Sequence, residues 1–97
     1  MIGNVKIFKE IREMEEKKLE LAIRRMVAEV NLNSKSVEMA KKNNFPLMEK
    51  DYFSRNLGIG IALYHLGYTL IEDGKRADRK GNGVGDIEYM HYRAIER

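Results

Sequence analysis

Residues 59–68, Ile-Gly-Ile-Ala-Leu-Tyr-His-Leu-Gly-Tyr, mark the point at which the polypeptide changes from helix to strand. Apolar side chains recur at helical spacing before Gly67, and a glycine directly after such a run is typical of a helix C-terminus, because it adopts the left-handed conformation without strain. The aromatic and β-branched residues 68–71 favour a strand. The sequence therefore predicts a helix from Met48 to Leu66 and a strand directly after it.

The region that follows this point predicts a β-hairpin. Residues 87–95 form a second strand-like run, and residues 72–86 between the two runs hold four of the eight glycines. This polar connection also carries the densest group of basic residues in the protein. We expect a glycine-rich, basic hairpin loop over residues 72–86.

The N-terminal third predicts either one long helix or two in succession, since residues 5–30 contain no glycine or proline. Its apolar face changes direction: Ile7, Ile11, Met14 and Leu21 form one stripe, whereas the other apolar residues of 19–30 form another about a third of a turn away. We interpret residues 1–18 as a helical extension of a domain over residues 19–97. The alternative is a break near residues 15–18 and two short core helices.

A further short helix is predicted between these regions. Residues 31–36, Asn-Leu-Asn-Ser-Lys-Ser, are dense in residues that cap helix N-termini, and Asn43, Asn44 and Pro46 end the run that follows. The expected fold class is α+β, mainly α, with three helices followed by a hairpin.

This order of elements, with its Leu-Gly-Tyr helix end at 66–68 and the turn Asp-Gly-Lys-Arg at 73–76, resembles the winged helix-turn-helix domains of phage and plasmid replication proteins and of small repressors. The resemblance implies a cofactor-free DNA-binding protein, either a transcriptional regulator or a replication accessory factor. It also implies that the third helix lies at the major groove and the hairpin on the flanking phosphates. Four residues of the third helix are expected to face the core: Ile59, Ala62, Leu63 and Leu66.

The candidate DNA-binding residues follow from these positions. Lys75, Arg76, Arg79 and Lys80 of the hairpin could contact phosphates, with the alternative that they belong to a solvated loop. Ser54, Arg55 and Asn56 of the third helix could reach base edges, although they could equally cap or pair with neighbouring acids. Lys35 could add a phosphate contact.

Composition narrows the other function classes. The net charge of +3 is a weak bias towards polyanions, and the absence of cysteine excludes disulfides, thiolate metal sites and a cysteine nucleophile. His65 and His91 are the only histidines and lie on different predicted elements, so we expect neither a metal site nor an enzyme. No run is apolar enough for a membrane helix, so we expect a cytoplasmic protein without membrane contact.

Two apolar surfaces remain without a predicted place in the core. The third helix carries a second stripe, Phe53, Leu57, Ile61 and Tyr64, which favours an alternative function as a protein-interaction module that docks a partner on this stripe. The N-terminal stripe of Ile7, Ile11 and Met14 predicts a homodimer in which two N-terminal extensions pair.

Overall fold

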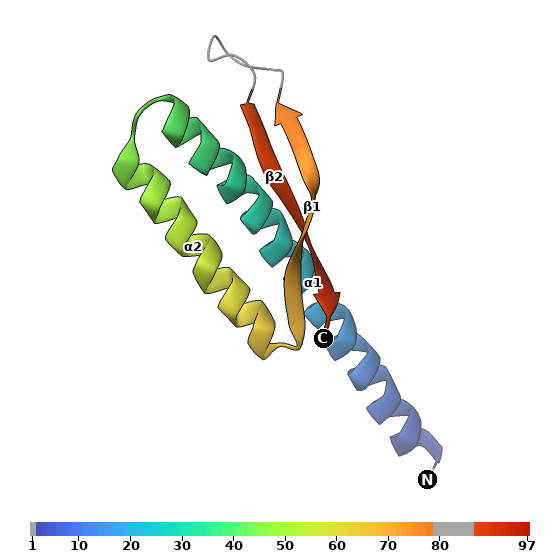
Figure 1. Ribbon diagram of the computed structural model, residues 1–97. Coiled ribbons are helices and arrows are strands. Elements are labelled where there is room, and N and C mark those ends of the chain that lie inside the picture. Colours follow the sequence, from blue (N-terminus) through green and yellow to red (C-terminus); the bar gives the residue numbers. More distant parts are fainter. Residues whose placement is uncertain (1, 79–86) are drawn as a thin grey trace.

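The computed structural model describes residues 2–78 and 87–97, with side chains from residue 5 onward. Two helices are followed by two strands: α1 (Ile2–Lys42), α2 (Pro46–His65), β1 (Tyr68–Asp78) and β2 (Ile87–Glu96) (Figure 1). The mainly helical α+β class is confirmed. The predicted helix number is wrong, because the described residues form two helices where three were expected.

The extra helix was predicted because polar residues of 31–36 were interpreted as caps. α1 instead continues without interruption through residues 15–18 and through residues 31–36. The side chains of Asn31 and Ser34 form hydrogen bonds with the backbone of β2, and Asn33 donates one to Asn56 of α2. Because these side chains have tertiary partners, they do not compete with the helical backbone as they would at a helix end.

The turn between the helices is set by local sequence. Asn44 has a positive φ of 59°, and the N–H groups of Asn44 and Phe45 donate to the carbonyls of Lys41 and Ala40. This pattern closes the C-terminus of α1, and Pro46 follows in the first turn of α2, where its missing N–H costs nothing. α2 then runs back along the second half of α1 (Figure 1).

The hairpin begins as predicted but its first strand is longer. Gly67 has a φ of 90° and ends α2, and β1 pairs antiparallel with β2 from Tyr68 opposite Glu96 to Asp78 opposite Ile87. Residues 72–78 were expected in the loop, yet they continue β1 beyond an irregularity between Glu72 and Lys75. The remainder of the predicted loop, residues 79–86, lies outside the described residues.

The core is small. Five apolar side chains are buried among the described residues: Ile23, Val30, Ala40, Leu63 and Ile87. Leu63 is confirmed as a core residue at 0% exposure, whereas Ala62 and Leu66, which were predicted to face the core, are exposed. The core lies farther round α2 than the sequence stripe suggested, because α2 also packs against Asn33 through Asn56.

The first half of α1 has no cover. Every described side chain from residue 5 to residue 22 is exposed, and this half projects away from α2 and the hairpin (Figure 1). The molecule is accordingly elongated, measuring 65 × 25 × 20 Å. We call residues 5–18 the arm.

Candidate functional site

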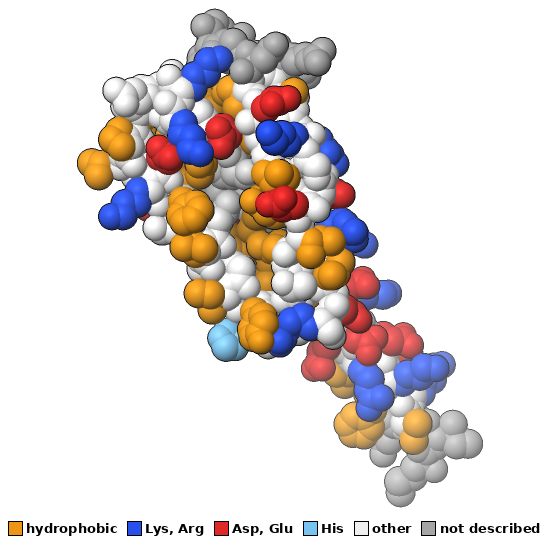
Figure 2. Space-filling view, in the orientation of Figure 1, with side chains coloured by type: hydrophobic (Ala, Val, Ile, Leu, Met, Phe, Trp, Pro, Cys, Tyr) orange, Lys and Arg blue, Asp and Glu red, His pale blue; other side chains and the backbone are white. Residues whose placement is uncertain are grey.

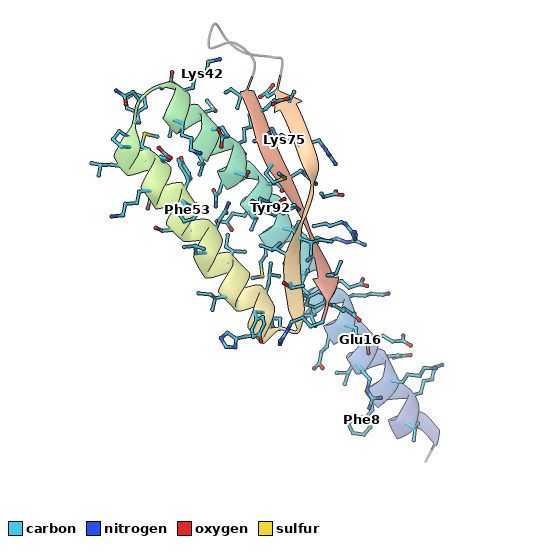
Figure 3. The ribbon with its side chains drawn as sticks, in the orientation of Figure 1. Phe8, Glu16, Lys42, Phe53, Lys75 and Tyr92 are labelled. Atoms are coloured by element: carbon cyan, nitrogen blue, oxygen red, sulfur yellow. The ribbon has the colours of Figure 1, made fainter. Side chains whose placement is uncertain are left out.

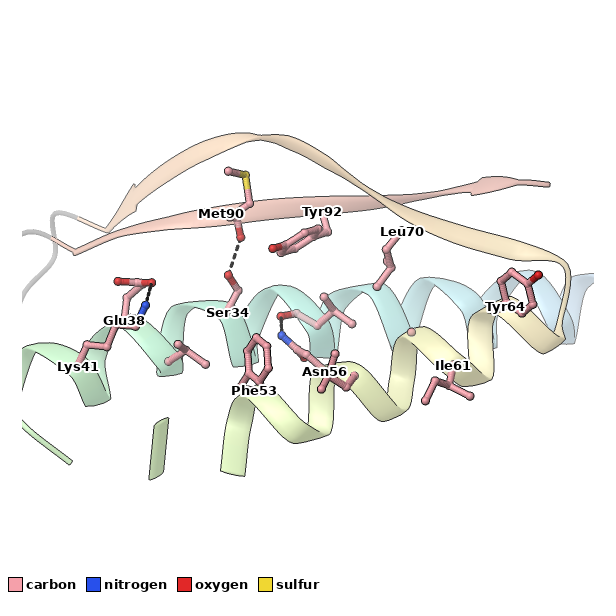
Figure 4. A pocket seen from close by; sticks show the side chains of 14 residues that line it. Ser34, Glu38, Lys41, Phe53, Asn56, Ile61, Tyr64, Leu70, Met90 and Tyr92 are labelled. Atoms are coloured by element: carbon pink, nitrogen blue, oxygen red, sulfur yellow. Dashed lines mark hydrogen bonds and ion pairs between the residues drawn. The ribbon is translucent and has the colours of Figure 1, made fainter. Parts of the chain in front are cut away.

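An apolar groove lies between α1, α2 and the hairpin (Figure 4). Its volume is about 630 Å³, and α1 forms its floor while α2 and the hairpin form its walls. The lining residues are Val30, Ser34, Val37, Glu38, Lys41, Phe53, Asn56, Leu57, Gly60, Ile61, Tyr64, Leu70, Met90 and Tyr92.

The α2 wall is the second apolar stripe that the sequence showed. Phe53, Leu57, Ile61 and Tyr64 are each between 53% and 60% exposed. In the space-filling view, hydrophobic side chains form a band along α2 and line the hollow between α2 and the hairpin (Figure 2). The stripe therefore lines a concave surface and is not a flat exposed patch.

Most polar groups of the groove already have intramolecular partners. The Ser34 hydroxyl donates to the Met90 carbonyl at 2.6 Å, and the Asn56 amide donates to the Val30 carbonyl at 3.1 Å. At one end, the Lys41 ammonium lies 3.3 Å from the Glu38 carboxylate. The groove thus offers apolar contact area with few polar groups that could orient a small ligand.

Arg97 contacts α2 at Tyr64, one of the residues that line the groove. The Arg97 guanidinium lies 3.5 Å from the centre of the Tyr64 ring and donates a hydrogen bond of 2.9 Å to the Tyr64 carbonyl. The Arg97 N–H also donates to the Gly67 carbonyl. These contacts fix the end of β2 against the end of α2, so the two walls of the groove are held together.

Two of the three residues predicted to read DNA bases have partners within the molecule. Asn56 is held between the Val30 carbonyl and Asn33, so it faces the domain. Arg55 lies 2.9 Å from Asp51 and 5.4 Å from the centre of the Tyr52 ring, which is the pairing that the sequence left open as an alternative. Ser54 is exposed and lies beside them on α2.

Three of the predicted phosphate contacts, Lys35, Lys75 and Arg76, lie among the described residues. Lys35 forms an ion pair with Asp78, and the hydrogen bond between them raises the pKa of Lys35 above its ordinary value of 10.5. Lys75 and Arg76 are exposed on β1, and Figure 3 shows Lys75 on the side of the molecule away from α2. Arg79 and Lys80 lie outside the described residues.

An acidic side chain also offsets part of the positive charge of the hairpin. The Asp73 carboxylate lies 3.5 Å from Arg76, 3.7 Å from Arg93 and 3.4 Å from Nδ1 of His91. That nitrogen is buried, and its contact with Asp73 is close without being a hydrogen bond, so it has no hydrogen-bond partner among the described residues. The Asp73 carboxylate therefore lies close to the side chains of Arg76, His91 and Arg93 at the middle of the hairpin.

Two other classes of site, a metal site and a membrane-spanning helix, are not found in residues 2–78 and 87–97. No group of His, Asp or Glu side chains there could hold a metal ion. Neither helix combines the length and hydrophobicity that crossing a membrane requires.

The sequence identified only part of the groove. The α2 stripe was recognised, but Leu70, Met90 and Tyr92 were not, because nothing local shows which face of the hairpin α1 covers. The arm residues Val5 and Phe8 were also missed, since they lie off the stripe of Ile7, Ile11 and Met14; all five are between 46% and 71% exposed. Comparison with known proteins finds no matching family model, no similar curated protein and no similar solved structure.

Proposed function

We propose that this protein is a non-enzymatic interaction module whose groove binds an amphipathic helix. The observation that carries this proposal is the concave apolar surface with Phe53, Leu57 and Ile61 more than half exposed on its wall. Amphipathic helices bind in such grooves through apolar side chains at intervals of three and four residues. Exposed apolar surface of this extent in a small domain is typical of a binding site.

The dimensions of the groove favour a helix over a small molecule. From Phe53 to Tyr64 the α2 wall spans three helical turns, or about 17 Å at 1.5 Å per residue. A helix of about 11 to 14 residues matches this length. Ser34 and Asn56, which could otherwise orient a small ligand, are already bonded to the backbone.

DNA binding, the prediction drawn from the winged-helix resemblance, has less support. The base-reading positions Arg55 and Asn56 are engaged within the molecule, and Lys35 is paired with Asp78. A protein that binds duplex DNA needs cations that can reach phosphates along one face. Binding to random duplex DNA at low salt tests this hypothesis directly, and its absence would end it.

The groove is tested with a designed helical peptide that carries leucines on one face and a fluorescent label. We expect saturable binding by fluorescence anisotropy to the full-length protein carrying Phe8→Asp, a change outside the groove that keeps copies of the protein from competing with the peptide. Ile61→Asp, which places a charge on the wall, should weaken binding at least about thirtyfold. Ala62→Asp is the matched control, because Ala62 is exposed on the same helix and does not line the groove.

Two results would refute the proposal. One is the absence of saturable binding to the Phe8→Asp protein. The other is equal binding by the two variants when circular dichroism shows that both are folded.

A further inference from the structure

We infer that the helix bound in the groove is the arm of a second copy of this protein, so that two copies exchange arms reciprocally. This inference rests on the proposed function and names its partner. It starts from two unpartnered apolar surfaces on one molecule: the concave groove and the projecting arm. The exposed apolar side chains of the arm are Val5, Ile7, Phe8, Ile11 and Met14.

The arm cannot fill the groove of its own molecule. α1 is one continuous helix from Ile2 to Lys42, and the groove floor begins at Val30 on that same helix. Folding back would require a break in the helix near residue 18, where no glycine or proline weakens it. Contact between arm and groove must therefore be made between two copies.

The lengths of the two surfaces agree. The arm, residues 5–18, is about 21 Å long at 1.5 Å per residue, and the exposed stripe on α2 is about 17 Å. The bare half of α1 is also about as long as the half that α2 and the hairpin cover (Figure 1). A two-fold axis perpendicular to α1 near its midpoint therefore lays each bare half along the covered half of the other copy.

The directions of the side chains agree with this symmetry. At about 100° per residue, Val5 and Phe8 project from the same face of α1 as Val30 and Val37, which form the groove floor. Two antiparallel helices related by such an axis meet through the same face along their whole length. The operator that places the arm over the groove thus also turns Val5 and Phe8 towards its floor.

Phe8 is the expected anchor. It is 69% exposed and stands on the projecting half of α1 (Figure 3). Ile11 lies about 60° from it, on the side of α1 that faces α2, so in the groove it approaches the stripe of Leu57 and Ile61. Large aromatic side chains that insert into a partner's pocket contribute most to the affinity of such interfaces.

Pairing of arm with arm is the rival arrangement. It would bury Ile7, Ile11 and Met14 but leave the groove open on both copies, with Phe53, Leu57 and Ile61 in water. Arm exchange instead covers the groove together with Val5, Phe8 and Ile11 in a single symmetric contact, and it leaves Ile7 and Met14 on the opposite side of the arm. It also completes the binding site, because the groove of each copy, formed by α1, α2 and the hairpin, receives the arm of the other copy.

Light scattering on the full-length protein and two single variants distinguishes the arrangements. The unmodified protein should have twice its monomer mass of 11.3 kDa at micromolar concentration. Phe8→Asp in the arm and Leu57→Asp in the groove should each raise the dimer dissociation constant at least about thirtyfold. Lys6→Asp and Ala62→Asp, on the polar side of the arm and the outer face of α2, are matched controls that stay dimeric.

Mixing the two dissociated variants supplies a second readout. The groove of the Phe8→Asp variant and the arm of the Leu57→Asp variant are both intact, so an equimolar mixture should form a heterodimer although neither variant dimerises alone. A mixture of Ile11→Cys and Leu57→Cys variants should also be joined between copies by a short bis-maleimide, since the sequence has no native cysteine.

Each other outcome overturns the inference. A dimer that Leu57→Asp leaves intact, whether or not Phe8→Asp dissociates it, would mean that the groove does not receive the arm. A protein that is monomeric at all concentrations yet binds the designed helical peptide would refute the arm exchange and leave the proposed function standing. A monomeric protein that binds no peptide would refute both.

Discussion

At the scale of single residues, polar side chains inside α1 connect the elements. Asn31 accepts a hydrogen bond of 2.7 Å from the Tyr92 N–H and donates one of 3.0 Å to the Tyr92 carbonyl, and so pairs with the backbone as a neighbouring strand does. The Ser34 hydroxyl donates to the Met90 carbonyl of the same strand. Through these bonds, the outer edge of β2 is covered by α1.

Asn31→Leu should destabilise the fold by about 1 to 3 kcal/mol, because both backbone groups of Tyr92 lose a partner in a half-buried place. Urea unfolding at a fixed protein concentration measures the loss. Leu32→Ala is the control, since Leu32 is 64% exposed on the next position, and its change should stay within about 0.5 kcal/mol. Equal effects would show that the Asn31 bonds do not stabilise the hairpin.

The ion pair between Lys35 and Asp78 predicts a pH dependence. The pKa of Lys35 is raised in the folded state by the hydrogen bond to Asp78, so the pair contributes stability below about pH 10.5 and loses it as the pH rises through the raised value. The melting temperature of the unmodified protein should therefore exceed that of Lys35→Met at about pH 8, and the difference should shrink towards about pH 11.5. A difference that stays constant over this range would contradict the prediction.

At the scale of elements, α2 is buried along one side and offers its other apolar side to the groove. Leu63 is fully buried, Asn56 bonds α1, and Phe53, Leu57 and Ile61 remain exposed. A helix that is apolar on two sides needs cover on both. In a single copy of the protein, only one of these two sides of α2 is covered.

Leu63→Ala should therefore cost about 2 to 5 kcal/mol of unfolding free energy, because it removes a fully buried side chain from a small core. Leu66→Ala serves as the comparison: Leu66 is 44% exposed, and its loss should cost about 1 kcal/mol or less. Thermal and urea unfolding of the two variants distinguish the structure, in which only Leu63 is buried, from the sequence-based prediction, in which both leucines face the core. Similar losses would mean that α2 is rotated from the orientation described.

At the scale of the whole molecule, apolar surface exceeds the core that could bury it. Eighteen large apolar side chains among the described residues are more than a third exposed, against five apolar side chains that are buried. A protein of 97 residues has a small stability margin, and contact between copies would add to it by mass action. Folding and association should then be linked.

The melting temperature of the full-length protein should accordingly rise with its concentration, by roughly 3 to 8 °C for each tenfold increase. Differential scanning calorimetry over two decades of concentration measures this effect. Leu57→Asp should melt at a lower temperature that does not depend on concentration. A concentration-independent midpoint for the unmodified protein would show that association does not stabilise the fold.

The sequence alone determined the features that depend on neighbouring residues. Pro46 and Gly67 bound α2, the residues at 68–71 and 87–95 form strands, and Phe53, Leu57, Ile61 and Tyr64 share one face of α2 as their spacing indicated. Helix ends, strand propensity and side-chain periodicity arise from contacts within a few residues, so they can be read without a partner element.

Only the tertiary structure decided the rest. α1 continues through residues 31–36 because Asn31 and Asn33 bond residues 61 and 23 positions away, and the Asn33 bond holds the Asn56 side chain against α1. The groove likewise forms only when α2 and the hairpin both pack on α1. Local preferences of these polar residues amount to a few tenths of a kcal/mol to about 1 kcal/mol, so hydrogen bonds to distant elements override them, and those partners are invisible in a local pattern.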